Sequence, residues 1–135
     1  MPERAPSEEP LWITSATLHV LHDQQVTIFG GHHGVVDDNV IESTLARPIH
    51  KWHHEQMDIA GLAAAYLCGF AQKQEFIDGN KRTALVAALV FLEANGYEVD
   101  VPADELYALT LMVAHAELHE SQIALWFRTR LMLGS

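Results

Sequence analysis

Residues 74–84 read Gln-Glu-Phe-Ile-Asp-Gly-Asn-Lys-Arg-Thr-Ala, and they lead directly into an apolar run that ends at Asn95-Gly96. Asp-Gly-Asn favours a turn, because Gly accepts positive φ and Asp and Asn bond to nearby backbone groups. The residues that follow are mostly Ala, Leu and Val, and Gly commonly ends a helix. The sequence therefore predicts a tight loop that feeds into a buried helix over residues 80–95.

This loop has the properties of an anion-binding site. The first N–H groups of a helix have no intrahelical acceptor, and the helix dipole adds partial positive charge there. Gly79 lets a ligand approach the backbone, and Asp78 supplies a carboxylate that suits a magnesium ion bridging to phosphate. Three of the eight basic residues lie close by: Lys73, Lys81 and Arg82. The alternative is an ordinary helix-entry turn followed by a solvated Lys-Arg pair.

Length and composition indicate one globular domain. The chain has 135 residues, of which 49% are hydrophobic and 19% charged, so it can bury one sizeable core. Residues 1–11 are rich in Pro and charged side chains and are expected to form a flexible tail. Residues 12–135 then form a single helical domain.

Charge and cysteine content exclude several classes of function. A net charge of −10 disfavours direct nucleic-acid binding, because an acidic surface repels the phosphate backbone. No apolar run reaches the roughly 18 residues that a membrane span needs. Cys68 is the single cysteine, so an intrachain disulfide is impossible. These features predict a cytoplasmic protein without a membrane partner.

Hydrophobic periodicity predicts an all-α fold. Besides the helix at 80–95, helices are expected at residues 14–25, 40–46, 59–72, 102–115 and 122–133. Pro48 is expected to end the second of these. Two β-prone runs, 26–29 and 35–36, flank a glycine-rich segment and predict a small hairpin-like flap or an ordered loop. The predicted architecture is a compact bundle of about six helices with one small β element.

The segment Phe76–Ala84 resembles the signature loop of the Fic/Doc family, in particular its Doc (death-on-curing) branch, whose pattern is His-Pro-Phe-x-Asp-Gly-Asn-Lys-Arg-Thr-Ala. The resemblance extends over residues 18–99 and implies the helical Fic fold. Its further matches are Gly30-Gly31-x-x-Gly34 with Asp37, Glu42-Ser43-x-Leu45-Ala46-Arg47-Pro48, Leu62-Ala63-Ala64-Ala65-Tyr66 and Phe91-Leu92-x-x-Asn95-Gly96.

The resemblance also assigns roles to individual residues. Asp78 would hold Mg²⁺, Gly79 and Asn80 would line the anion pocket, and Lys81 and Arg82 would bind the phosphates of ATP. The flap around residues 27–36 would dock the target polypeptide.

The resemblance further implies a toxin of a toxin–antitoxin system. Family members transfer AMP or, in the Doc branch, the γ-phosphoryl group of ATP to a hydroxyl of a target protein. Doc-type toxins act on the translation factor EF-Tu and are neutralised by a separate Phd-like antitoxin. Leu85 stands where the Fic branch has a second arginine, which favours phosphoryl transfer, whereas Gly79 resembles the AMP-transferring loops. The sequence has no Ser/Thr-x-x-x-Glu inhibitory segment, so any inhibitor is expected to be a separate polypeptide.

Gln74 is the central departure from the family pattern, because it occupies the position of the catalytic histidine. A carboxamide can orient a hydroxyl but is far too weak a base, and loss of a general base typically costs about 10²–10⁴ in rate. Glu75, in place of the usual proline, is an alternative base. The sequence therefore predicts a phosphotransferase with impaired turnover, or a non-catalytic nucleotide- or antitoxin-binding module on the same scaffold.

Two histidines, His115 and His119, lie four residues apart on a predicted helix, a spacing that can place both imidazoles on one metal. No third ligand of similar spacing accompanies them. The favoured interpretation is therefore that they are exposed or capping side chains.

Overall fold

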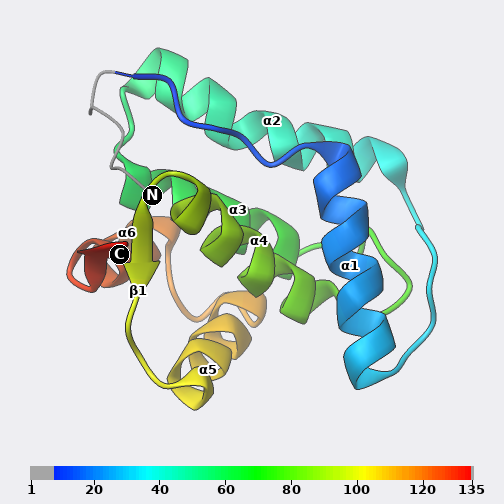
Figure 1. Cartoon of the computed structure of the whole chain (residues 1–135). Helices are drawn as coiled ribbons and strands as arrows, with labels where there is room; N and C mark the ends of the chain where they lie inside the picture. Colours follow the sequence, from blue (N-terminus) through cyan, green and yellow to red (C-terminus); the bar gives the residue numbers. More distant parts are fainter. Residues whose placement is uncertain (1–7, 135) are drawn as a thin grey trace.

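Residues 8–134 are described by a computed structural model, and within them the chain forms six helices and two short strands (Figure 1). The all-α fold predicted from the sequence is confirmed. None of the described helices is long and apolar enough to cross a membrane. In chain order the elements are α1 (Ser15–Phe29), α2 (Asp38–Glu55), α3 (Ile59–Ala71), α4 (Asn80–Ala94), β1 (Tyr97–Val99), α5 (Ala103–Ala114), α6 (Glu120–Arg128) and β2 (Leu131–Leu133).

Helix α3 forms the centre of the core, and its residues from Ala60 to Ala71 are all buried. Helices α2, α4, α5 and α6 pack around it (Figure 1). Small residues permit this close packing: a Cβ atom added at Gly69 would lie 2.6 Å from the Thr44 methyl group of α2. Asp58 begins α3 by accepting a hydrogen bond from the Gly61 N–H (2.9 Å), as expected for an N-cap.

Helix α4, which begins at the signature loop, lies against α3 and is flanked by α1 and α5. Its far end is fixed by the Asn95 side chain. Nδ2 of Asn95 donates to the carbonyl oxygens of Phe91 (2.8 Å) and Leu11 (3.0 Å), and Oδ1 accepts from the Leu11 N–H (2.9 Å). This bond set ties the segment before α1 to α4. Of the tail predicted at 1–11, residues 1–7 lie outside the described residues.

The segment predicted to form a hairpin-like flap does not do so. Helix α1 continues through residues 26–29, where Val26 is buried in its last turn, and ends at Gly30 with φ 88°. Beyond it, the loop at 30–37 forms only a single bridge, between Val35 and Phe76. A run of β-prone residues thus became helical, because burial of Val26 against the core outweighs its intrinsic preference.

The second helix is longer than predicted. Pro48 was expected to stop it, but α2 continues through Pro48 to Glu55, and Pro48 is buried within it. The residues after Pro48 are retained in the helix by packing, since Trp52 lies edge-on to Trp12, with ring centroids 6.4 Å apart, and packs on the core. Tertiary contact therefore overrides the helix-breaking tendency of proline.

The last helix is shorter than predicted, and the β element lies there instead. Helix α6 ends at Arg128, and β2 pairs antiparallel with β1 in the register Tyr97↔Leu133, Glu98↔Met132 and Val99↔Leu131. Within the described chain this pair is the whole sheet. The prediction of a helix to residue 133 was wrong because pairing with a strand more than 30 residues earlier in the sequence leaves no local signal.

Candidate active site

A cleft of about 470 Å³ opens at the N-terminal end of α4. It contains all six residues predicted for the site. These are Gln74, Asp78, Gly79, Asn80, Lys81 and Arg82. The remaining lining residues are Ala71, Gln72, Lys73 and Ile77 from the same segment, and Tyr107, Ala114 and His115 from α5 and its C-cap.

The loop that forms this cleft is locked by Asn80 and Phe76. Oδ1 of Asn80 accepts from the Phe76 N–H (3.0 Å), and Nδ2 donates to the Phe76 carbonyl oxygen (2.9 Å). The Phe76 ring is fully buried and anchors the loop in the core, as its apolar character predicted. The Asn80 side chain therefore shapes the loop as well as lining the cleft.

The N-terminus of α4 is left open toward the cleft. Its N-cap is Gly79, which adopts the left-handed conformation with φ 78° and has no side chain to accept the first N–H groups. By contrast, Thr14, Asp37 and Asp58 cap α1, α2 and α3 with side-chain oxygens. Free N–H groups at a helix N-terminus favour an anion, so the backbone here fits phosphate.

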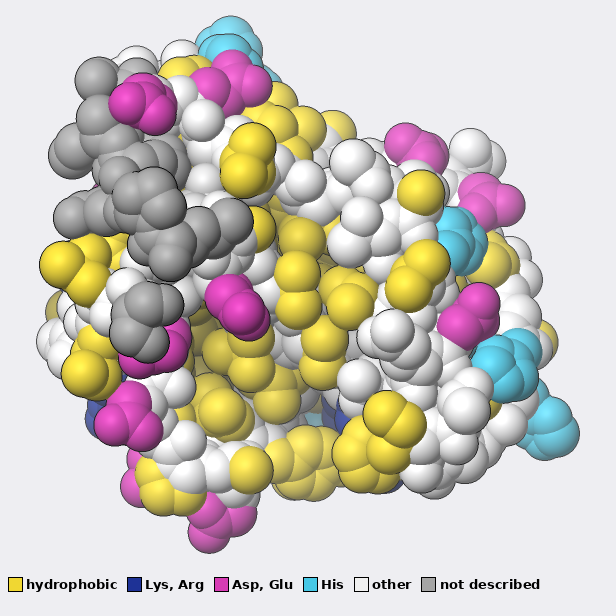
Figure 2. Space-filling view, in the orientation of Figure 1, with side chains coloured by type: hydrophobic (Ala, Val, Ile, Leu, Met, Phe, Trp, Pro, Cys, Tyr) yellow, Lys and Arg dark blue, Asp and Glu magenta, His cyan; other side chains and the backbone are white. Residues whose placement is uncertain are grey.

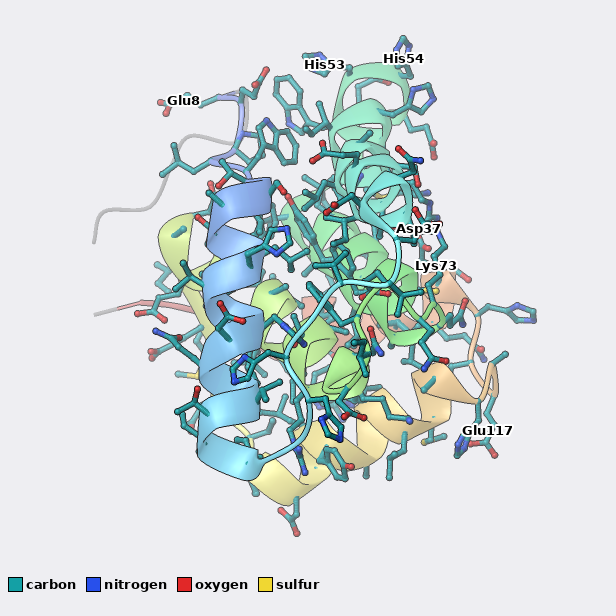
Figure 3. The ribbon with its side chains drawn as sticks, turned by 90° about the vertical axis from the view of Figure 1, so that its right-hand side faces the viewer. Glu8, Asp37, His53, His54, Lys73 and Glu117 are labelled. Atoms are coloured by element: carbon teal, nitrogen blue, oxygen red, sulfur yellow. The ribbon has the colours of Figure 1, made fainter. Side chains whose placement is uncertain are left out.

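Three cations surround this open end. The Lys81 side chain is exposed and forms no hydrogen bond or ion pair with any residue that the structure describes. The guanidinium of Arg82 stacks over the Phe29 ring, 4.6 Å from its centroid. Nζ of Lys73 donates to Oγ1 of Thr44 (3.2 Å), which places Lys73 beside the second turn of α2 (Figure 3). The positive charge predicted from the sequence is therefore gathered at the cleft.

Asp78 is half-buried on the cleft wall, where Oδ2 accepts the His32 N–H (2.8 Å). Its Oδ1 accepts no hydrogen bond from a described residue. No group of three or more His, Cys, Asp or Glu side chains in the described chain could hold a metal ion by itself. A single carboxylate beside a helix N-terminus that fits phosphate is nevertheless compatible with Mg²⁺, which usually takes one or two protein carboxylates and completes its shell with water and phosphate.

Gln74 and Glu75, the two residues before Phe76, lie in different environments. Gln74 is exposed and lines the cleft, whereas Glu75 is fully buried and does not. Neither carboxylate oxygen of Glu75 has a hydrogen-bond partner in the part of the chain that the structure describes, and burial raises the pKa of Glu75 to about 7. Glu75 therefore cannot reach a substrate in the cleft, and the alternative of Glu75 as the base is wrong for this arrangement.

Three residues near the site were not predicted from the sequence. His22 of α1 is buried and donates from Nε2 to the Asp78 carbonyl oxygen (2.7 Å). Tyr107 and His115 line the cleft from α5, where a separation of eight residues places them on one face. The eight-residue spacing is the one sequence signal that could have indicated Tyr107 and His115 as cleft residues. His115 is the C-cap of α5 and His119 the N-cap of α6, so these two imidazoles do not share a helix, in agreement with the favoured interpretation.

A comparison with known proteins matches the part of the chain that contains the loop at the cleft. The model of the Fic/DOC family matches residues 12–92, which is more than half of the chain. The chain belongs to the Fic/Doc family. The Fic/Doc match contains α1 to α3, the whole signature loop and α4 as far as Leu92, whereas α5, which contributes Tyr107, lies beyond it.

Curated relatives place this Fic/Doc protein in the Doc branch. It is 37% identical over 114 residues to "Protein kinase doc" of Escherichia phage P1, a match that covers 83% of this chain and 89% of the relative. It is 34% identical over 93 residues to "Toxin Doc" of Mycolicibacterium smegmatis, covering 62% of this chain and 66% of the relative.

Proposed function

We propose that this chain is a Doc-type toxin, an ATP-dependent protein phosphotransferase whose turnover is slowed by Gln74. The observation that carries the proposal is one cleft that combines the uncapped N-terminus of α4 with Asp78, Lys81 and Arg82. The names of the two relatives, a protein kinase and a toxin, agree with it.

The cleft is suited to a nucleoside triphosphate with its cation. The N–H groups that follow Gly79 would bind phosphate oxygens, and the Lys81 and Arg82 side chains would neutralise further charge. Asp78 would hold Mg²⁺, which supplies charge neutralisation across neighbouring phosphate oxygens when bound. On a chain of net charge −10, this cluster is the local exception that admits a small polyanion.

Gln74 would orient the hydroxyl of the target protein without removing its proton. Its carboxamide oxygen accepts a hydrogen bond, but an amide does not take up a proton near neutral pH. In phosphoryl transfer, positioning and charge neutralisation contribute most of the catalysis. We therefore expect residual turnover that is about 10²–10⁴ below that of the histidine form.

Transfer of the γ-phosphoryl group is favoured over transfer of AMP. Leu85, at the position of the second arginine of the Fic branch, is packed partly against the core and does not line the cleft. The cleft therefore lacks that second guanidinium. Gly79, which resembles the AMP-transferring loops, supports the other reaction, and isotope placement in the experiment below separates the two.

A second candidate function is a non-catalytic module that binds nucleotide or an antitoxin. The observation that favours it is the missing base: Gln74 is a carboxamide, and the neighbouring Glu75 is buried away from the cleft. In this case the protein would act by occupancy, with bound ATP but no turnover even when a histidine is restored.

We propose a Phd-like antitoxin and EF-Tu as the partners. Figure 2 shows hydrophobic side chains gathered in a band down the middle of one face, with acidic side chains at its margins. Exposed apolar residues of this kind mark interaction surfaces, and an amphipathic antitoxin helix would cover them. We also propose a cytoplasmic location, where both partners would be met.

The test uses the purified chain and its Gln74→His variant with Mg²⁺ and ATP labelled either at the γ- or at the α-phosphate, together with EF-Tu or a bacterial lysate. We expect γ-label on a protein band, with an initial labelling rate about 10²–10⁴ higher for Gln74→His. Gln24→His, on the exposed surface of α1, adds an imidazole elsewhere and should change nothing. The absence of any label with Gln74→His would contradict the enzyme, and calorimetry with ATP would then decide whether the second candidate holds.

A further inference from the structure

A histidine of α1 supports the Asp78 loop from outside the cleft. His22 is only 2% exposed, and its ring lies flat on the Phe76 ring, with centroids 3.7 Å apart and an interplanar angle of 7°. Its Nε2 is 2.7 Å from the Asp78 carbonyl oxygen. Because a carbonyl oxygen only accepts hydrogen bonds, Nε2 carries the proton and donates it.

The same ring also lies close to the turn that begins α4. A Cβ atom added at Gly79 would lie 3.6 Å from Cδ2 of His22 and 3.5 Å from Cγ2 of Val26, so the left-handed turn at Gly79 lies beside these two side chains of α1. His22 therefore contacts Phe76 and Asp78 and lies next to Gly79, all within four residues of the loop. One side chain from a different helix thus supports the loop between the Asp78 carboxylate and the first N–H groups of α4.

The other contact that holds Asp78 does not depend on a side chain of its partner. His32 donates to Oδ2 of Asp78 through its backbone N–H, which nearly any residue at that position would supply. His22 donates through its imidazole, so this bond exists only because residue 22 is a histidine or another side chain with a donor of similar reach. Substitution at His22 therefore removes the hydrogen bond from the imidazole to the Asp78 carbonyl oxygen and leaves the bond from the His32 N–H in place.

We infer that His22 is a positioning residue for the cation and phosphate site of this chain. It does not line the cleft and acts only through the backbone of Asp78 and Gly79. The inference rests on the proposed function of the cleft as a site for ATP and its cation. It goes beyond the signature loop, because it places one determinant of that site on α1.

Two variants separate the hydrogen bond from the packing. His22→Phe keeps an aromatic ring on Phe76 but removes the donor, whereas His22→Gln keeps a donor but loses the ring. The matched control is His19→Phe, one turn earlier on α1. The His19 ring lies edge-on to the same Phe76 ring, with centroids 5.8 Å apart, and makes no hydrogen bond to Asp78. For each protein we would measure Tm, the Kd of ATP with Mg²⁺, and amide NMR spectra without ligand.

We expect the two His22 variants to rank in opposite orders for thermal stability and for ATP affinity. Tm should fall more in His22→Gln, because it loses the buried ring, whereas the Kd of ATP with Mg²⁺ should rise about tenfold in His22→Phe and stay within about threefold of wild type in His22→Gln. A purely structural role predicts that affinity follows Tm, and that result would overturn the inference. His19→Phe should leave the Kd unchanged.

The ligand-free spectra decide the inference even if the proposed function fails. In His22→Phe the amide signals of residues 78–82 should shift, and exchange of the Thr83 amide, which donates to the Gly79 carbonyl oxygen, should accelerate about tenfold. These changes should be absent in His19→Phe. If wild type binds no ATP at millimolar concentration, the proposed function is wrong. If the loop signals do not respond to His22→Phe, the positioning role is wrong.

Discussion

The guanidinium of Arg82 lies over the ring of Phe29, 4.6 Å from the ring centroid. Phe29 is the last residue of α1, and Arg82 stands in the first turn of α4. An aromatic face attracts a cation and restricts the conformations that its side chain samples. The end of α1 therefore orients one of the positive charges that line the cleft.

Replacing Phe29 by Leu should weaken ATP binding. The substitution removes the aromatic face but keeps an apolar side chain, so Arg82 becomes freer and loses more entropy when it binds phosphate. We expect the Kd of ATP with Mg²⁺ to rise roughly twofold to fivefold, as suits an exposed cation–π contact. Calorimetry checks this, with Phe29→Tyr as the control that keeps the face. An equal loss in both variants would exclude the stacking as the cause.

Replacing Asn80 by Ala should destabilise the protein and impair the cleft together. The substitution leaves the N–H and carbonyl of Phe76 without their partners in a partly buried loop, which costs about 1–3 kcal/mol of unfolding free energy. Chemical denaturation measures this loss. Asn39→Ala is the matched control, because Asn39 is exposed in the first turn of α2 and its side chain has no partner among the described residues. Equal stability of the two variants would show that the hydrogen bonds from Asn80 to Phe76 do not stabilise the fold.

Replacing Glu75 by Gln should remove a pH dependence of stability. Burial raises the pKa of Glu75 to about 7 from 4.5, so between these values the folded state binds more protons than the unfolded state. Stability therefore falls as pH rises through this window, by about 3 kcal/mol in total, since one pKa unit corresponds to about 1.4 kcal/mol.

Glu75→Gln keeps the shape of the side chain and cannot ionise. We expect it to be more stable than wild type at pH 8.5, and to lose that advantage near pH 4.5. Urea denaturation at both pH values measures the difference, with Glu42→Gln on the exposed surface of α2 as the control. A stability difference that is the same at both pH values would show that the Glu75 carboxyl does not ionise within this window.

Replacing Ala116 by Gly should stabilise the protein. Ala116 has φ 57°, a left-handed conformation that costs a residue with a Cβ atom about 1 kcal/mol and costs glycine little. The gain is expected as a rise in Tm of several degrees. Ala108→Gly, at an exposed position inside α5, should have the opposite sign, because glycine disfavours a helix interior by about 1 kcal/mol. A loss of stability in both variants would show that the turn is not strained.

The cleft itself was predictable because its information is local. Asp78, Gly79 and Asn80 form a turn that precedes an apolar helix, and every one of the predicted site residues falls within nine positions of Gln74. Start signals such as Asp58 and the apolar runs of α3 and α4 were equally local. Short-range propensities and capping rules are sufficient for features of this kind.

The features that were missed depend on contacts between distant segments. Nothing near His22 in the sequence distinguishes a buried histidine that supports a loop 56 residues away from an exposed one on an amphipathic helix. The continuation of α2 past Pro48 depends on packing of the following turn, and β2 depends on its pairing with β1. Such choices are decided by tertiary structure, which a single sequence encodes without a local pattern.

The hydrogen bond from the His32 N–H to Oδ2 of Asp78 affects how this carboxylate would bind a cation. Oδ2 already accepts that bond, so Oδ1 is the carboxylate oxygen of Asp78 that is more available to a cation. A magnesium ion would have to complete its coordination mainly with water and phosphate. We therefore expect metal and nucleotide to act as one thermodynamic ligand, each binding poorly alone, so that the concentration of free Mg²⁺ sets the apparent affinity for ATP.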